Sequence, residues 1–217
     1  MGCTAEQGND CFDDEKPAHK VTLSTYYIGE TEVTQELWKA VMGGNRSYFK
    51  GDSRPIESVS WNDCQTFIRK LNKRTDKKFR LPTEAEWEFA ARGGTKSAGY
   101  KYSGSNDVNA VAWYSVNAYD IGGSSPDYGT HVVKTKKPNE LGIYDMSGNV
   151  WEWCYDWCGN YSDGAQSNPQ GPTTGSRRVI RGGGWYSYAR HCRSSSRDHC
   201  SPGLRYITIG LRLVLIP

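Results

Sequence analysis

The stretch from Arg178 to Leu215 constrains the chain most, because its two ends look fixed while its middle looks free. At the front, Arg181–Trp185 (RGGGW) is a tight glycine turn closed by a large aromatic side chain. At the back, residues 209–213 (IGLRL) alternate as a half-buried strand does. Residues typical of a scaffold recur between these ends, namely Arg190, Cys192, Arg193, Ser194 and Arg197. The stretch therefore predicts a rigid frame.

The other positions of this stretch, which we term the variable positions, have no periodicity and no shared chemistry. They are Tyr186, Ser187, Tyr188, His191, Asp198, His199, Cys200, Ser201, Leu204, Tyr206, Ile207 and Thr208. Such a set does not form the apolar face of one helix or strand. We therefore expect the frame to display these side chains on the surface, for binding.

Length and charge limit the possibilities further. The chain of 217 residues can bury a sizeable core, and it has no internal repeat or low-complexity linker, so a single domain over 19–217 is expected. Residues 1–18 are polar and acidic, which predicts an N-terminal tail or a loosely docked arm. The net charge of +3 does not indicate nucleic acid or an anionic membrane as partner. No apolar run approaches the roughly 20 residues of a membrane span.

Seven cysteines is an odd number, so not all of them can pair within one chain. The spacing of Cys154 and Cys158, and the dipeptides His191-Cys192 and His199-Cys200, would allow a transition-metal site, but none matches a zinc ribbon. Small buried residues with one or two disulfides are the favoured interpretation. Met1-Gly2-Cys3 is similar to a lipoprotein cysteine without an apolar signal region before it, so a mature fragment is expected.

Capping patterns predict three helices. Thr34 caps a helix over Gln35–Met42, Ser60 begins a second, and Thr83 begins a third that Gly93 ends.

Strand signals are weaker than the helix signals. Residues 21–28 (VTLSTYYI) are β-branched and aromatic, which predicts a strand. Residues 94–138 break into turns, with a short strand expected at Val132-Val133. Residues 160–176 are again rich in Gly, Pro and Ser, as loops are.

Six motifs together point to a known family. In chain order they are GETEVTQELW, PIESVSWNDC, RLPTEAEWEFAARGG, NELGIYDMSGNVWEW, RVIRGGGW and IGLRL. From His19 onward nearly the whole chain resembles the formylglycine-generating-enzyme (sulfatase-modifying factor) family. The resemblance implies an α+β, C-type lectin-like fold of the formylglycine-generating-enzyme subtype, loop-rich with few helices and short twisted sheets. The three capped helices agree with that architecture.

The resemblance implies catalysis only where copper-binding cysteines are present. Family members that oxidise a sulfatase cysteine carry two such cysteines in an insertion after the glycine turn. Here that interval is Tyr186–Ala189, without a cysteine, and Cys192 matches a structural position of the family. Because Cu(I) chemistry needs soft thiolate ligands, we expect the chain not to be an enzyme. The alternative is an oxidase of the formylglycine-generating type acting on sulfatase cysteines.

The family also binds calcium around the motif GNVWEW. By that resemblance, Glu152 and the carbonyls of Ser147, Gly148 and Val150 would hold a structural calcium ion, since calcium prefers oxygen ligands. In the alternative interpretation, Glu152 is a buried carboxylate paired with an arginine such as Arg181 or Arg212. Asn106, Asp107 and Asn109 allow the same idea more weakly, and a solvated turn is favoured there. No other cofactor is expected.

A narrower resemblance covers residues 178–215, the variable region. The frame RVxRGGxWxxxARxCRSxxR…P…R…IGxRL is similar to variable proteins of diversity-generating retroelements, particularly lipoproteins of the TvpA type. Those systems randomise template adenines, so that AAY codons become NNY codons, which cannot encode Lys, Gln, Glu, Met or Trp. Every variable position obeys this exclusion. Accident explains each position easily and the whole set poorly, so diversification is the favoured interpretation.

The prediction for function is a non-catalytic ligand-binding display protein on the cell surface or outside the cell, as a bacterial lipoprotein. The partner is expected to be an unidentified protein or other surface ligand, with membrane attachment only through a lipid anchor outside the folded domain. Specific nucleic-acid binding is not expected, because acidic residues interleave with the arginines. The frame arginines are expected to pair with acids such as Asp145, Glu152 and Asp156. These arginines are Arg190, Arg193, Arg197, Arg205 and Arg212.

Overall fold

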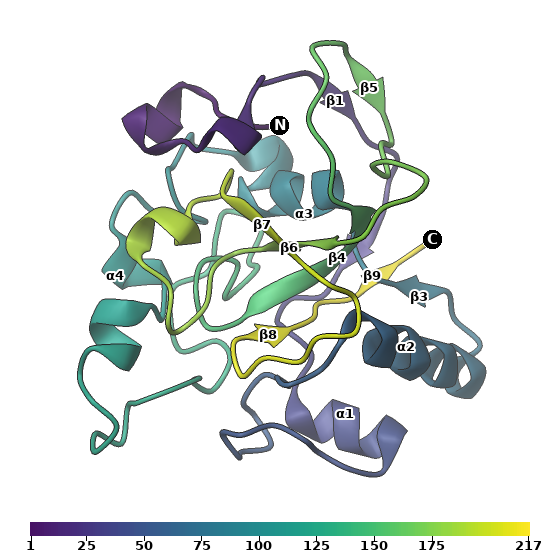
Figure 1. Ribbon diagram of the computed structural model, residues 1–217, viewed down its shortest axis with the longest axis vertical. Helices are drawn as coiled ribbons and strands as arrows, with labels where there is room; N and C mark the ends of the chain where they lie inside the picture. The colour runs from purple at the N-terminus through teal and green to yellow at the C-terminus, as the bar shows by residue number, and fades with distance from the viewer.

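A four-stranded sheet with the order β7-β6-β4-β8 lies at the centre of the computed structural model, which describes residues 1–217 (Figure 1). Its strands are β4 (Trp151–Trp157), β6 (Arg178–Arg181), β7 (Arg197–Cys200) and β8 (Ile209–Gly210). β6 runs antiparallel to both β4 and β7, and β8 is parallel to β4. Three of the four strands belong to the variable region, which is therefore part of the central sheet.

Two helices, α1 (Gln35–Met42) and α2 (Trp61–Thr75), share the larger hydrophobic core with one face of this sheet. Trp38 of α1 stacks on Phe67 of α2, with ring centroids 4.8 Å apart, and Trp153 and Ile180 of the sheet join the same cluster. Both helices begin where their caps predict, because the side chains of Thr34 and Ser60 accept hydrogen bonds from backbone amides of the first turn.

The third helix, α3 (Glu84–Ala91), packs against the opposite face of the sheet. Its Trp87 is fully buried and shares a cluster with Cys154 and Val179. Successive strand residues point to opposite faces, so Trp153 and Cys154 enter different clusters. The sheet is thus buried on both sides, and the predicted capping box of Thr83 is confirmed.

The remaining elements are short. β1 (Val21–Thr22) pairs with β5 (Gln166–Ser167), and β9 (Val214–Leu215) lies between β2 (Tyr27–Ile28) and β3 (Phe79–Arg80). α4 spans Val108–Val111. Further helical turns are at Ala5–Asp10, Asp13–Glu15, Gly94–Lys96, Ser115–Tyr119 and Ala189–Cys192.

Three strand predictions were wrong in extent. The stretch 21–28 forms β1 and β2 with no strand between them, and Val132-Val133 lies outside any strand. Only the first two residues of 209–213 are strand, and all five are buried rather than alternately exposed. The polar residue of this run, Arg212, is buried because it pairs with a carboxylate inside the protein.

Residues 1–18 pack against the domain, so the prediction of a tail or loosely docked arm was wrong. Gln7 and Glu15 are fully buried, and Glu15 forms an ion pair with Arg193 of the variable region. A disulfide joins Cys3 to Cys11 within this segment. The acidic character that indicated a tail in fact neutralises a buried frame arginine.

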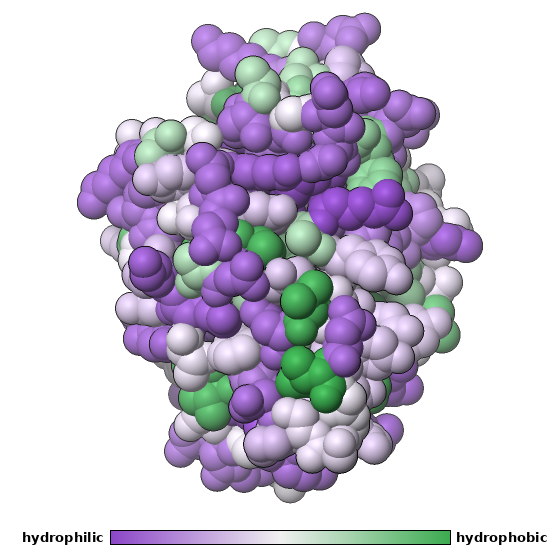
Figure 2. Space-filling model, turned by 90° about the vertical axis from the view of Figure 1, so that its left-hand side faces the viewer, coloured by the Kyte–Doolittle hydropathy of each residue, from purple (hydrophilic) through white to green (hydrophobic).

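None of the helices combines the length and the apolar character needed to cross a bilayer. The side of the molecule that carries α4 is mostly hydrophilic, with apolar residues only in small groups (Figure 2). Small apolar groups of this kind are normal on a protein surface.

Candidate ligand-binding site

Most variable positions lie at the surface. Tyr186, Tyr188 and Tyr206 are 52%, 67% and 49% exposed. Asp198, Ser201, Leu204 and Ile207 are also exposed, and Ser187, His191, His199 and Thr208 are half-buried. Cys200 is the exception, because its side chain belongs to the larger hydrophobic core.

Backbone groups hold this surface in place. Carbonyl oxygens at the variable positions accept hydrogen bonds from the frame, and every residue type has such a carbonyl. The bonds are Ser58 N to Tyr206 O (2.9 Å), Trp151 N to Thr208 O (2.8 Å) and Trp185 Nε1 to Ile207 O (3.0 Å). One side chain does take part in the frame, since Ser187 Oγ accepts a hydrogen bond from Gly184 N (3.0 Å). The conformation of this surface therefore depends little on which side chains it carries.

One groove of about 460 Å³ gathers the C-terminal variable positions. Trp151, Ile180 and Ile209, from the neighbouring strands β4, β6 and β8, lie on its floor and are almost fully buried. Arg177, outside the variable region, also lines it. The variable positions in the groove are Asp198, His199, Cys200, Ser201, Leu204, Tyr206 and Thr208. The fixed floor residues look like ordinary core residues in the sequence, so nothing in it marked them as part of a site.

Tyr186 belongs to an aromatic cluster around Trp185. The Tyr186 ring lies 4.1 Å from that of Tyr119 and 5.9 Å from that of Trp185. A hydrogen bond with Tyr186 raises the pKa of Tyr119. Phe49 and Tyr128 each pack edge-on within 5.1 Å of the buried Trp185. Residues far outside the variable region thus extend the aromatic surface, which the sequence did not indicate.

His191 connects the variable region to the N-terminal segment. Its ring stacks on Phe12 at 5.2 Å and lies 6.3 Å from the ring of Trp151. Arg190 also packs on Phe12, with its guanidinium carbon 4.9 Å from the ring centroid, and it has no carboxylate partner. The expected acid for Arg190 is therefore replaced by an aromatic ring.

The other frame arginines pair with carboxylates, but mostly not with the expected ones. Arg197 forms a bidentate pair with Glu84 (2.7 and 2.7 Å), and Arg205 does so with Asp63 (2.6 and 2.8 Å). Arg193 pairs with Glu15, as described above. Of the expected acids, only Glu152 pairs with an arginine, because Asp145 and Asp156 accept backbone amide hydrogen bonds instead.

Of the expected calcium ligands, Glu152 has its carboxylate hydrogen-bonded within the protein. Both oxygens of Glu152 accept hydrogen bonds, from Arg212 (2.7 to 3.1 Å) and from Trp87 Nε1 (2.7 Å). Ser147 Oγ bonds to the backbone of Ser103 and Cys192. Gly148 and Val150 are also buried. The ion-pair alternative for Glu152 is the one that the structure shows, with Arg212 as partner.

Burial disfavours the thiolate form of the free cysteines. Cys64, Cys154, Cys158, Cys192 and Cys200 remain unpaired in the structure. Burial raises the pKa of each of these thiols, to about 12 for Cys192. Thiols of this kind are poor ligands for a soft metal ion until they lose their protons.

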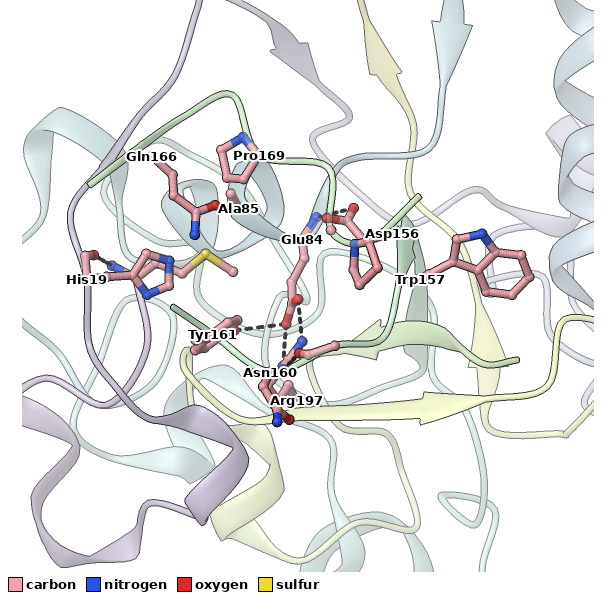
Figure 3. Close-up of a pocket in the computed structure, with 14 residues that line it drawn as sticks. His19, Glu84, Ala85, Asp156, Trp157, Asn160, Tyr161, Gln166, Pro169 and Arg197 are labelled. Carbon is pink, nitrogen blue, oxygen red and sulfur yellow. Dashed lines mark hydrogen bonds and ion pairs between the residues drawn. The ribbon is translucent and has the colours of Figure 1, made fainter. Parts of the chain in front are cut away.

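A small polar cavity of about 60 Å³ lies between α3, β4 and the loop after β4 (Figure 3). Glu84 lies at its centre, with hydrogen bonds from Arg197 and from Tyr161 Oη (3.0 Å). Asp156 lines the same cavity and accepts a hydrogen bond from the backbone amide of Glu84 (2.9 Å). Burial, and then the nearby Glu84 carboxylate, raise the pKa of Asp156 to about 8. No sequence pattern indicated this cavity.

The fold and the exposed loops define a class of protein, a C-type lectin-like domain of the formylglycine-generating-enzyme subtype with few helices and short sheets. The chain belongs to the family described as "Sulfatase-modifying factor enzyme 1-like domain", whose model matches residues 1–216. The resemblance drawn from the six motifs is therefore confirmed.

By name, the similar proteins include a chaperone, an enzyme and a variable protein. The chain is 40% identical over 213 residues to "Chaperone protein LppX" of Paenibacillus barcinonensis, covering 77% of this chain and 71% of that protein. It is 34% identical over 188 residues to the formylglycine-generating enzyme of Streptomyces coelicolor, covering 81% of this chain but 57% of the enzyme. Treponema denticola variable protein 1 superposes with a TM-score of 0.82 at 39% identity, covering 92% of this chain and 87% of that structure. The resemblance to retroelement variable proteins is thus also confirmed at the level of fold and sequence.

Proposed function

We propose that this chain is a non-catalytic binding protein, whose C-terminal variable region is diversified by a retroelement and forms an exposed binding surface. The observation that carries this proposal is that the contacts which hold the variable region in place hardly involve the variable side chains. Hydrogen bonds to backbone carbonyls hold the variable positions, and buried arginine–carboxylate pairs stabilise the frame. Side chains can therefore change without loss of the fold.

The types of residue exposed at the variable positions support a binding role. Tyr186, Tyr188 and Tyr206 supply stiff, amphipathic contact area, and Ser201 and Thr208 supply adaptable hydrogen bonds, as in antibody paratopes. The similarity to Treponema denticola variable protein 1 points the same way. The ligand is an unidentified protein or other surface ligand, and we propose no specific nucleic acid and no required cofactor.

The encoding DNA tests diversification directly. A near-identical template repeat beside a reverse transcriptase gene should differ from the variable region only where the template has adenine. Differences at other template bases would contradict the proposal.

We further propose that the protein acts at the cell surface or outside the cell, held by a lipid anchor that lies outside the folded domain. The Cys3–Cys11 disulfide supports this location, because disulfides persist in oxidising compartments. This disulfide leaves the Cys3 thiol unavailable for a lipid. Protease shaving of intact cells, followed by detection of the domain, measures the location.

The second candidate is an oxidase of the formylglycine-generating type, favoured by 34% identity to the Streptomyces coelicolor enzyme. Cys154 and Cys158 pack in one cluster and are the two thiols that would serve it. Against it stands the raised pKa of both thiols, whose cause is burial. Incubation with Cu(I), oxygen and a sulfatase peptide separates the two functions, since formation of an aldehyde would establish the oxidase.

A further inference from the structure

The groove has two parts of different origin. Its rim consists mostly of variable positions, whereas Trp151, Ile180 and Ile209 on its floor and its basic residue, Arg177, are fixed positions, which lie outside the variable set. Diversification at the rim leaves the floor and Arg177 unchanged. Any ligand that enters the groove therefore meets the same apolar floor and the same guanidinium.

Arg177 is the one arginine that lines the groove, and it is not a variable position. Its side chain is exposed and forms no ion pair; Nη1 lies 3.3 Å from Nδ1 of His199, a variable position. A guanidinium carries five N–H donors, so most of them remain free for a ligand. The one acid of the groove, Asp198, is itself a variable position, and its Oδ1 accepts a hydrogen bond from the backbone amide of His199.

Neighbouring arginines are not available in the same way. Arg205 is held by Asp63 in a bidentate pair. Arg178 is stacked between the rings of Trp61 (4.0 Å) and Trp157 (3.5 Å). Recognition of an anion in this groove thus depends on Arg177.

We propose that the frame sets the ligand class, and that the groove takes a peptide segment with an acidic side chain beside a large apolar one. The carboxylate would pair with Arg177 and the apolar side chain would lie on the floor formed by Trp151, Ile180 and Ile209. Arginine binds carboxylates through two parallel hydrogen bonds, which fixes the orientation of the segment. The variable positions then choose among segments of this class. This inference rests on the proposed binding function.

A library of random peptides, displayed on phage and selected on the purified protein, tests the ligand class. The selected peptides should be enriched in Asp or Glu within one or two positions of a large apolar residue. Arg177→Gln should weaken binding of these peptides about tenfold or more, since a hydrogen bond to a charged group is lost. Arg177→Lys should restore part of the affinity because the charge returns.

The controls separate this inference from the proposed function. Arg46→Gln, an exposed arginine that does not line the groove, is the matched control and should leave binding unchanged. Selection of no peptides, or of peptides without acidic residues, overturns the ligand class, and so does binding that is equal in the wild type and Arg177→Gln. Peptides that bind equally after Leu204→Ser and Tyr206→Ala would instead overturn the display function itself.

Discussion

At the scale of single residues, neighbours in the chain have opposite roles. Trp185 is buried under an aromatic cluster and donates a hydrogen bond to the Ile207 carbonyl, whereas Tyr186 and Tyr188 project into solvent. The same contrast separates Trp151 from the exposed Tyr206 across the groove. Stability and binding should therefore respond to different substitutions.

The first prediction compares these two groups. Replacing Tyr186, Tyr188 and Tyr206 together by Ala should leave the melting temperature nearly unchanged, since exposed side chains typically contribute within about 0.5 kcal/mol each. Trp185→Ala should cost about 3–5 kcal/mol, because it opens a cavity and removes a hydrogen bond. Denaturant unfolding of both variants measures the difference. A large loss of stability in the triple variant would mean that these tyrosines belong to the core.

The second prediction concerns the proton on Asp156. Its pKa is raised to about 8 in the folded protein by burial, whereas an unfolded Asp titrates near 4. The folded state therefore binds the proton more tightly, and this contribution to stability is complete below about pH 4 and is lost as the pH rises through about 8. Asp156→Asn keeps an acceptor for the Glu84 amide without the charge.

The variant should be more stable than the wild type by about 5 kcal/mol near pH 9, which is the free energy of a shift of about four pKa units, and the gain should shrink toward pH 4. Thermal unfolding across this pH range measures the gain. Asp163→Asn, at an exposed position, is the control and should follow the wild type. A gain for Asp156→Asn that does not vary with pH would show that its carboxyl is not perturbed.

At the scale of elements, the N-terminal segment acts as a part of the variable region's frame. Glu15 accepts hydrogen bonds from Arg193 and from Ser195 Oγ, and Phe12 stacks on His191. Arg193 lies in the interior with Glu15 as its ionic partner. A segment that looks dispensable in the sequence thus compensates a buried charge in the region that carries the binding surface.

The third prediction tests this compensation. Glu15→Ala should cost about 3–5 kcal/mol in the free energy of unfolding, because it leaves a buried arginine without its partner. Asp13→Ala, two residues away, breaks only a solvent-exposed pair with Lys16 and should cost less than about 1 kcal/mol. Equal effects of the two substitutions in denaturant unfolding would contradict the role given to Glu15.

Local signals in the sequence were enough for helices α1, α2 and α3, but not for α4 or for the strands. Caps such as Thr34, Ser60 and Thr83 act on backbone groups within one turn, so their geometry follows from the sequence alone. Strands depend on distant partners, and here β1 pairs with β5 and β2 with β9 over most of the chain length. That is why the single strand expected at 21–28 is two short ones.

The same distinction explains what could be predicted of the site. Exposure of positions such as Tyr186 and Tyr206 followed from a pattern of free residues within a fixed frame. Arg177, and the pairing of Arg193 with Glu15, depend on contacts across the fold that no local pattern records. Glu152 has the sequence context of the family's calcium motif, and its ion pair with Arg212 is another contact across the fold that no local pattern records.

At the scale of the whole molecule, a sheet buried on both faces supports the surface formed by the variable positions, and most of these side chains do not contribute to the hydrophobic core. Helices α1 and α2 share a core with one face and α3 with the other, so the sheet's position does not depend on the exposed loops. The loops return to the sheet through backbone hydrogen bonds at Thr208 and Tyr206. Stability and recognition are thus carried by different atoms of the same region.

The last prediction follows from this separation. Replacing the exposed variable positions by another set of residues allowed by NNY codons, with Cys200 and Ser187 kept, should leave the melting temperature within a few degrees of the wild type. Cys200 and Ser187 are kept because one belongs to the core and the other accepts a hydrogen bond from Gly184 N. A matched control carries the same number of changes at buried frame positions such as Val179 and Leu211, and should unfold at far lower denaturant.

The peptides selected by the swapped protein should differ in identity yet keep their acidic residue, since Arg177 is unchanged. If the swapped protein lost its cooperative unfolding, the variable side chains would be part of the fold, and a frame of backbone contacts could not be what holds the surface.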